Sequence, residues 1–375
     1  MTMISELSEE LVVEILSRVP LTSLSSVRST VKQWNALSKD VIVCKADARH
    51  QFLGFMVLDS RVWSVRFDLC LNNDTSIKRV GKLDQFNKVS TKVIHCNGLV
   101  LCVPYDQSSL VVWNPYLGQT KLIEPRTRHF ENRYGLGFDS YGCHKVLRFL
   151  DDLRVVECEI YDLNPSSSNN SWRVVDVNPD WSITCEPNRC VSLKGNTYWI
   201  AIDRKRIHEE DEEEFDWDDP SIVWDGFLIC FDFTTERFGP WLQLPVKGYF
   251  DATGSLSCVR EEQLALMFQH SDLYMMDVWL TTKIEPHLVS WSKFFAFDMT
   301  PYGGLKCAIQ HGSFFIDMEK KVTVLLDSTM SRDTPKRCIA YILGEDGYYM
   351  EVDLGSECKT RPTLCSYVPS LVQIE

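Results

Sequence analysis

The chain has 375 residues, of which 45% are apolar and 24% are charged, a composition typical of a folded protein and unlike that of a disordered or fibrous chain. Lysine and arginine total 39 against 52 aspartates and glutamates, which gives a formal net charge of −13. That charge repels phosphate backbones and anionic lipids, and no basic patch interrupts it, so we expect neither nucleic acid nor a membrane as a partner.

The first residues do not resemble a targeting signal. Acidic side chains stand where a secretory signal would carry basic ones, and no basic-then-apolar pattern follows. The chain also lacks a run of about eighteen apolar residues, the length that marks a candidate transmembrane helix. We therefore expect a soluble protein of the nucleus or the cytoplasm.

Residues 7–19 predict an amphipathic helix. Apolar side chains recur there with the 3.6-residue period of a helix, at Leu7, Leu11, Ile15, Leu16 and Val19. Ser8 can cap the start of this helix, and the acids at positions 9 and 10 oppose the positive end of its dipole. Pro20 ends it.

A second helical stripe runs through Leu24, Val27, Val31 and Trp34. Forty residues cannot bury so many large apolar groups by themselves. Either these helices pack on the rest of the chain, or part of their apolar surface docks on another protein.

The string LSEELVVEILSRVP at residues 7–20, followed by KQWNAL at residues 32–37, resembles the F-box over residues 4 to about 44. The resemblance implies an all-α module over residues 1–45 that binds an ASK-type adaptor of the Skp family and, through it, a cullin and a RING subunit. By position, the implied adaptor-binding residues are Leu7, Leu11, Ile15, Leu16, Val19, Pro20, Leu24, Val27 and Trp34. Two positions depart from the family pattern, because Ser8 replaces a proline and Val31 a cysteine. Serine still caps a helix and valine stays apolar.

From about residue 50 the pattern changes to short β-strands. Apolar runs rich in Val, Ile, Phe, Tyr and Trp, such as residues 99–103 and 227–231, are separated by Gly, Asn, Asp and Pro. Helical periodicity does not return, so the sequence predicts an all-β domain.

A recurring phrase within this domain favours a propeller. A strand ends in a large apolar residue followed by Asn or Asp at positions 113, 161, 231, 316 and 352, with a looser copy near 279, and successive copies lie 48, 70, 48, 37 and 36 residues apart. Propeller blades recur at about 40 to 50 residues, so the spacing predicts a β-propeller of about six blades, with a β-sandwich as the alternative. Residues 46–90 would form connecting strands or the first blade, and residues 91–375 the remaining blades.

Motifs spread over most of residues 90–373 resemble the plant F-box associated domain, type 1. They include HCNGLVLC at 95–102, VWNP at 112–115, YGLGFD at 134–139, VSLKGNTYW at 191–199, FDFTTERF at 231–238 and YVPSLV at 367–372. That family is described as a β-propeller related to kelch domains. The resemblance therefore implies the same fold that the spacing predicts.

Residues 209–219, EEDEEEFDWDD, form the densest block of acidic residues, within a segment from 208 to 220. Blocks of like charge repel one another, so we expect a solvated loop. Phe215 and Trp217 leave open a second interpretation, a short docking segment for a basic partner.

The sequence predicts no cofactor, metal or catalytic site. The fourteen cysteines contain no Cys-x-x-Cys pair, which favours free thiols. The closest group of ligand types, His95, Cys96 and Cys102, lies in an alternating strand that would scatter them, so we expect buried free thiols there. Glycine pairs lack the context of a phosphate loop, and no nucleophile-elbow sequence is present.

Together these features predict the substrate-recognition subunit of an SCF-type ubiquitin ligase, a non-catalytic protein that recruits a protein substrate for ubiquitination and degradation. Two alternatives stay open: an interaction module whose degenerate F-box no longer binds the adaptor, and a propeller lectin. The substrate-binding residues are unknown at this stage, because recognition depends on variable loops.

Overall fold

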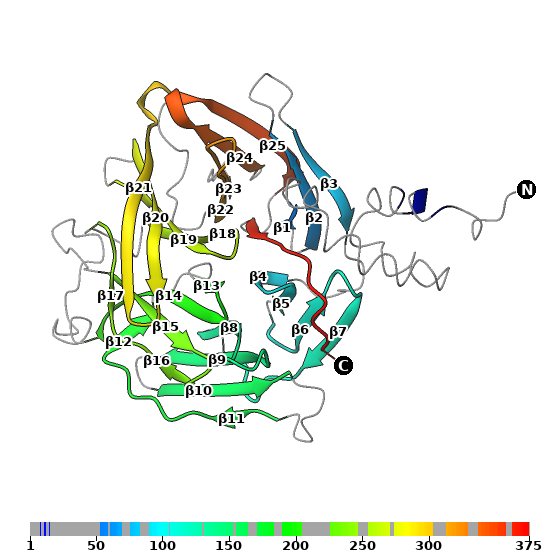
Figure 1. The fold of residues 1–375 in the computed structure, drawn as a ribbon, viewed down its shortest axis with the longest axis vertical. Helices are drawn as coiled ribbons and strands as arrows, with labels where there is room; N and C mark the ends of the chain where they lie inside the picture. Colours follow the sequence, from blue (N-terminus) through cyan, green and yellow to red (C-terminus); the bar gives the residue numbers. More distant parts are fainter. Residues whose placement is uncertain are drawn as a thin grey trace, which may run out of the picture.

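The chain folds into a β-propeller. The structure, a computed structural model, describes residues 8, 11, 12, 15, 53–58, 61–69, 76–82, 90–104, 106–129, 131–152, 155–163, 171–183, 190–204, 226–246, 254–270, 274–302, 313–328, 337–357 and 362–374. Within these residues the strands form six antiparallel sheets, and Figure 1 shows them arranged as blades around a central axis. None of the helices in the described ranges has the length and apolar character needed to span a membrane.

Blades 2 to 6 follow one another along the chain. Blade 2 consists of β4 (Ser90–Cys96), β5 (Leu99–Pro104), β6 (Leu110–Asn114) and β7 (Gln119–Ile123), and blade 3 of β8 (Asn132–Phe138), β9 (His144–Asp152), β10 (Val155–Asp162) and β11 (Arg173–Val174). Blade 4 consists of β12 (Trp181–Ile183), β13 (Cys190–Leu193), β14 (Asn196–Asp203), β15 (Phe227–Asp232), β16 (Arg237–Phe238) and β17 (Leu242–Gln243). Blade 5 consists of β18 (Gly254–Val259), β19 (Gln263–Gln269), β20 (Met275–Glu285) and β21 (Leu288–Asp298), and blade 6 of β22 (Ser313–Asp317), β23 (Val322–Ser328), β24 (Arg337–Gly344) and β25 (Tyr349–Glu357). Two short 3-10 helices, η2 (Thr300–Tyr302) and η4 (Glu345–Gly347), follow β21 and β24.

Blade 1 is assembled from both ends of the described propeller. Strands β1 (Leu53–Leu58), β2 (Arg61–Asp68) and β3 (Ser76–Lys82) pair in order, and β26 (Thr363–Ser366) pairs antiparallel with β1. The last strand of the chain therefore becomes the innermost strand of the first blade. This pairing closes the ring.

A serine links the closing strand to its other neighbour. The Ser313 hydroxyl at the start of β22 donates to the Leu364 carbonyl at 2.7 Å and accepts from the Leu364 amide at 2.9 Å. β26 is thus held by backbone bonds to blade 1 and by this side chain to blade 6.

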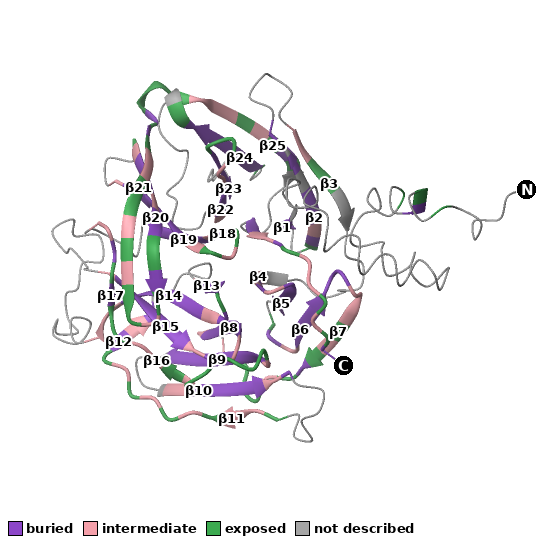
Figure 2. Cartoon of the chain, in the orientation of Figure 1, coloured by how far each residue is buried: buried purple, intermediate pink, exposed green. Residues whose placement is uncertain are grey.

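Buried apolar side chains fill the space between the blades. Six hydrophobic clusters are present among the described residues, and each combines side chains from two neighbouring blades, for example Tyr198 and Leu228 of blade 4 with Leu256 and Leu266 of blade 5. Figure 2 shows the burial concentrated along the inner and middle strands, while the outer strands β3, β7, β11 and β21 are more exposed. The core is therefore a ring of interfaces rather than one central cluster.

The two ends of the ring carry different connections. In blades 2 to 6, a short turn joins the innermost strand to the next strand of the blade at one end of the ring, which we call the hairpin face. Two of these turns, Asn97-Gly98 and Lys194-Gly195, have positive φ at both residues (47° and 79°, 50° and 83°), as a type I′ turn requires. The C-terminal residues 367–374 leave β26 at the same face. The predicted acidic loop 208–220 lies outside the described residues.

The predicted count of about six blades is confirmed, and the β-sandwich alternative is wrong. The recurring phrase, however, does not mark one position in every blade. Trp113, Tyr161 and Phe231 lie in third strands, whereas Ile316 lies in the innermost strand β22 and Val352 in the outer strand β25. The phrase therefore counts blade 6 twice and misses blade 1.

We expect Ser313→Ala to lower the free energy of unfolding by about 1–3 kcal/mol, because the Leu364 amide loses its hydrogen-bond acceptor between two blades. Urea denaturation of the purified chain measures this. Ser292→Ala, at an exposed position on β21, is the matched control and should change stability by less than about 0.5 kcal/mol. Equal midpoints for the two variants would contradict the role given to Ser313.

Candidate functional site

The N-terminal helix exposes part of its apolar surface. Leu11, Val12 and Ile15 are helical, and the Leu11 amide reaches the Ser8 hydroxyl at 3.5 Å, as the predicted N-cap requires. Val12 is buried, at 2% exposure, whereas Leu11 and Ile15 are 53% and 39% exposed. Two of the predicted adaptor-binding side chains therefore point outward together, one helical turn apart.

The remaining predicted adaptor-binding residues lie outside the described residues. They are Leu7, Leu16, Val19, Pro20, Leu24, Val27 and Trp34. The all-α module predicted for residues 1–45 is described only at residues 8, 11, 12 and 15, so the structure neither supports nor contradicts the rest of it.

Several motifs of the sequence meet around the C-terminal segment, residues 367–374, which we call the strap. Asn114, from the motif VWNP, is fully buried at the end of β6. Its amide nitrogen donates to the Ser370 and Val372 carbonyls at 3.1 and 2.7 Å, and its carbonyl oxygen accepts from the Tyr116 and Leu117 amides at 2.9 and 3.0 Å. One side chain thus shapes its own turn and fastens the strap across blade 2.

The motif HCNG holds the beginning of the strap. The Nε2 of His95 accepts from the Gly98 amide at 3.0 Å and from the Val368 amide at 3.5 Å, so its proton is on Nδ1, which lies 3.6 Å from the Glu261 carboxylate. Burial lowers the pKa of His95 to about 4, so the ring is neutral at pH 7. Gly98 lies so close to Ser370 that a Cβ at position 98 would come within 2.1 Å of the serine Cβ.

A second group of motifs fixes the contact between blades 3 and 4. A Cβ at Gly137, in the motif YGLGFD, would lie 2.2 Å from the Phe233 ring and 2.3 Å from the Gly195 carbonyl. Phe233 and Gly195 belong to the motifs FDFTTERF and VSLKGNTYW. These motifs therefore maintain the framework of the ring.

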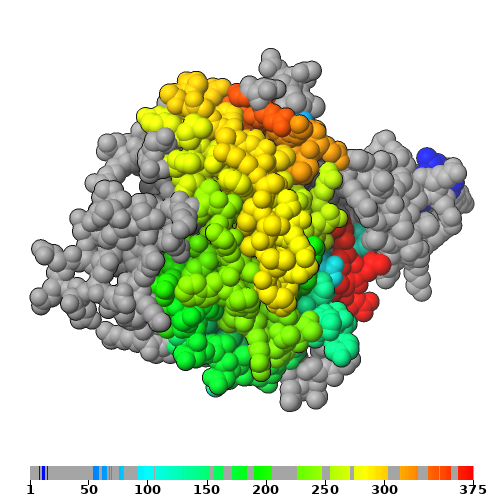
Figure 3. Space-filling model, turned by 60° about the vertical axis from the view of Figure 1, so that its left-hand side comes forward, coloured from blue at the N-terminus to red at the C-terminus, as the bar shows by residue number. Residues whose placement is uncertain are grey.

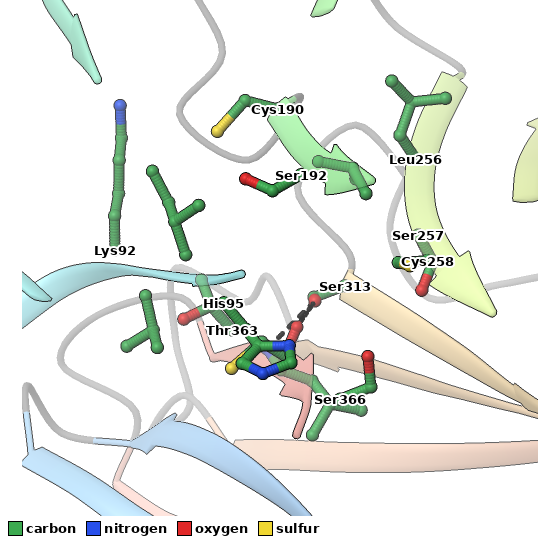
Figure 4. A pocket seen from close by; sticks show the side chains of 15 residues that line it. Lys92, His95, Cys190, Ser192, Leu256, Ser257, Cys258, Ser313, Thr363 and Ser366 are labelled. Carbon is green, nitrogen blue, oxygen red and sulfur yellow. Dashed lines mark hydrogen bonds between the residues drawn. The ribbon is translucent and has the colours of Figure 1, made fainter. Parts of the chain in front are cut away.

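The centre of the ring holds a narrow channel lined by both polar and apolar residues. Its lining includes Ser192, Ser257, Ser313 and His95 from four different innermost strands, and Figure 4 shows the three serines around the open space. The Ser192 hydroxyl already donates to the Leu136 carbonyl at 2.6 Å. The open volume of about 70 Å³ is enough for a few water molecules and is too small for a typical ligand.

The thiols near this channel are not activated. Burial raises the pKa of Cys258 and of Cys365 to about 12, so both are protonated at neutral pH and are poor nucleophiles. The predicted buried thiols at Cys96 and Cys102 are confirmed, and the described residues contain no group of three ligands that could hold a metal ion. Among the described cysteines, eight are thiols, and the prediction is wrong for Cys338, which forms a disulfide.

Arg148 is completely buried in β9, which was not predicted from the sequence. Its guanidinium donates to Glu157 at 2.6 Å and to Glu159 at 2.7 Å, both on β10, and to the Asn132 side chain on β8 at 3.2 Å. A buried charge requires such partners, so this group has a structural explanation within blade 3. Its one sign in the sequence is a charge in the middle of the apolar run VLRFL.

Comparison with known proteins identifies what the chain resembles. A family model described as "F-box associated beta propeller domain" matches residues 53–374. "F-box protein At3g19880" of Arabidopsis thaliana is 45% identical over 386 residues, which cover 100% of this chain and 94% of that protein. "F-box/kelch-repeat protein At3g13680" of the same plant is 44% identical over 404 residues, which cover 100% of this chain and 97% of that protein.

Solved structures show a more distant likeness. The structure titled "Crystal structure of Nidogen/Laminin Complex" has a TM-score of 0.44 at 12% identity, covering 85% of this chain and 99% of that chain. A luciferin-regenerating enzyme has a TM-score of 0.41 at 10% identity, covering 72% of this chain and 78% of that chain.

Asn114→Asp tests the attachment of the strap. The carboxylate can still accept from the Tyr116 and Leu117 amides but cannot donate to the Ser370 and Val372 carbonyls, so we expect faster hydrogen exchange in residues 368–374 and a loss of about 1–3 kcal/mol in stability. Asn114→Ala should lower the stability further, because the Tyr116 and Leu117 amides then lose their hydrogen-bond acceptor as well. Unchanged exchange in the strap of the Asp variant would contradict this attachment.

Protonation of His95 should destabilise the fold. Its pKa is lowered from 6.5 to about 4, so between these values the unfolded chain binds a proton that the folded chain does not, and stability falls as the pH falls. The contribution of the neutral His95 ring to the free energy of unfolding is fully present above about pH 6.5. It declines by up to ~1.4 kcal/mol per pH unit toward pH 4. Burial lowers the pKa of His144 to about 4 as well, so a slope persists without His95. Urea denaturation between pH 4 and 7 should give a shallower slope for His95→Gln than for the natural chain, and equal slopes would refute this.

Proposed function

Because this chain belongs to the plant F-box proteins that carry an F-box associated β-propeller domain, we propose that it is the substrate-recognition subunit of an SCF-type ubiquitin ligase, acting in the nucleus or the cytoplasm. In this role the N-terminal module binds an ASK-type adaptor of the Skp family, and the adaptor connects it to a cullin and a RING subunit. The propeller binds the protein to be ubiquitinated.

The exposed face of the N-terminal helix is the observation that supports adaptor binding. Leu11 and Ile15 lie one turn apart and remain 53% and 39% exposed in the isolated chain. Large apolar side chains that stay exposed side by side on a helix are typical of a surface that a partner covers. Both belong to the residues that the F-box resemblance assigns to the adaptor interface.

The protein would contribute binding rather than bond chemistry. The described thiols near the channel are protonated, and the motif residues are committed to the framework of the ring. Holding a substrate close to a ubiquitin-charged enzyme raises the effective concentration of its lysines at the reactive thioester. Such positioning can lower a barrier by several kcal/mol through entropy alone.

The double variant Leu11→Asp with Ile15→Asp tests the adaptor interface. Both side chains are exposed in the free chain, so the fold should survive the change. Adaptor affinity should fall by tenfold or more, because the removal of one apolar anchor from an interface costs about 2 kcal/mol of binding free energy. Titration of the purified chain with an ASK-type adaptor measures this.

The matched control is Leu122→Asp with Val174→Asp, since these propeller side chains are 69% and 68% exposed. The control should bind the adaptor as the natural chain does. If the helix variant binds as tightly as the natural chain, Leu11 and Ile15 do not form the adaptor interface and this support for the role is lost. If the natural chain does not bind the adaptor at all, the proposed role is wrong, and a degenerate F-box is the better explanation.

A further inference from the structure

Blade 5 carries the longest hairpin among the described strands. β20 and β21 have eleven residues each. Their register shifts near the tip, where Thr281 pairs with Trp291 and Lys283 with Ser290, so Thr282 is an extra residue. A bulge of this kind bends a hairpin and increases its twist.

The bent hairpin reaches the neighbouring blade. The Trp291 indole of β21 donates to the Gln243 carbonyl of β17 at 3.0 Å, which ties it to blade 4. At the tip, the Pro286 carbonyl lies so close to Gly239 that a Cβ there would come within 2.6 Å of it. Figure 3 shows the hairpin (yellow) as a band across the surface beside the green atoms of blade 4.

Next to this contact, an open cleft of about 430 Å³ lies between blades 4 and 5, and Pro286 is part of its lining. The end of β20 forms one wall, and the turns that carry Lys194 and Glu262 form the other, so the cleft opens on the hairpin face. Tyr198 and Ile284, which are 2% and 6% exposed, line it where it meets the core between the two blades. The volume is within the range of about 300–1,000 Å³ that is typical of binding pockets.

The lining of the cleft combines apolar side chains with charged ones, and its charges balance. Its charged side chains are those of Lys194, Lys283, Glu262 and Glu285, so the formal charges cancel in a chain whose net charge is −13. Lys283 and Glu285 pair at 3.2 Å with both side chains about half exposed. Such an exposed pair contributes little stability, so Lys283 or Glu285 can pair with a charged group of a bound partner instead.

This chemistry favours a peptide over an apolar small molecule. Pockets for small ligands are lined mainly by apolar and aromatic side chains, whereas this one adds the amides of Asn196 and Gln263 to its charges. Beside the cleft, Leu288 at the hairpin tip is 46% exposed and offers one apolar contact. A polar segment with one apolar side chain fits these features.

We propose that this cleft binds a short extended segment of the substrate protein, one that carries both an acidic and a basic side chain; this inference rests on the proposed function. Lys194 and Lys283 take the acidic side chain, and Glu262 takes the basic one. The segment would lie across the junction of blades 4 and 5, with an apolar residue beside Leu288.

A displayed library of short linear peptides tests the proposal on the full-length protein in complex with the adaptor. Peptides that carry both charges should be enriched on the natural chain, and synthetic copies should bind by fluorescence polarisation. Lys194→Glu with Lys283→Glu should weaken their binding by about tenfold or more, which corresponds to ~1.4 kcal/mol.

The matched control is Arg237→Glu with Lys320→Glu, which makes the same change in net charge at exposed positions outside the cleft. Adaptor affinity is measured in parallel and should be unchanged in both variants, which separates this test from that of the proposed function. The proposal is overturned if no peptide is enriched, or if the selected peptides bind the cleft variant and the control equally well.

Discussion

The closure of the ring is the constraint on which the rest of the structure depends. A blade whose innermost strand is missing exposes a row of backbone groups, and β26 removes that edge by pairing with β1. Each blade then has a neighbour on both sides, so all six clusters of apolar side chains between blades can form together. Ser313 and Asn114 reinforce the same closure from blades 6 and 2, through β26 and through the strap.

The fold was predictable because local signals repeat in it. The Asn97-Gly98 turn has the backbone angles that its sequence demands, and apolar runs separated by turn residues became strands. The spacing of the recurring phrase predicted the right number of blades, although the copies of the phrase do not correspond one to one to the blades. Ile316 and Val352 both lie in blade 6, and blade 1 was missed because its strands come from two distant parts of the chain.

The motifs and the cleft differ in how far the sequence could reveal them. Asn114, His95 and Gly98 stand in recognisable motifs, yet only the structure shows that all three hold the strap, because their partners lie 256 to 273 residues further along the chain. No pattern in the sequence indicated the cleft. Its lining includes an extra residue, Thr282, in a hairpin whose register shifts twice, and such shifts depend on strand pairing that a sequence does not specify.

The origin of β26 also imposes an order on the biosynthesis of the protein. β1 ends at Leu58 and β26 begins at Thr363, so 363 − 58 = 305 positions separate the two partners. At roughly 5–20 residues per second, the ribosome needs roughly 15–60 s to bridge that interval. During this time the nascent β1 has one unpaired edge, and a chain without β26 would keep that edge open.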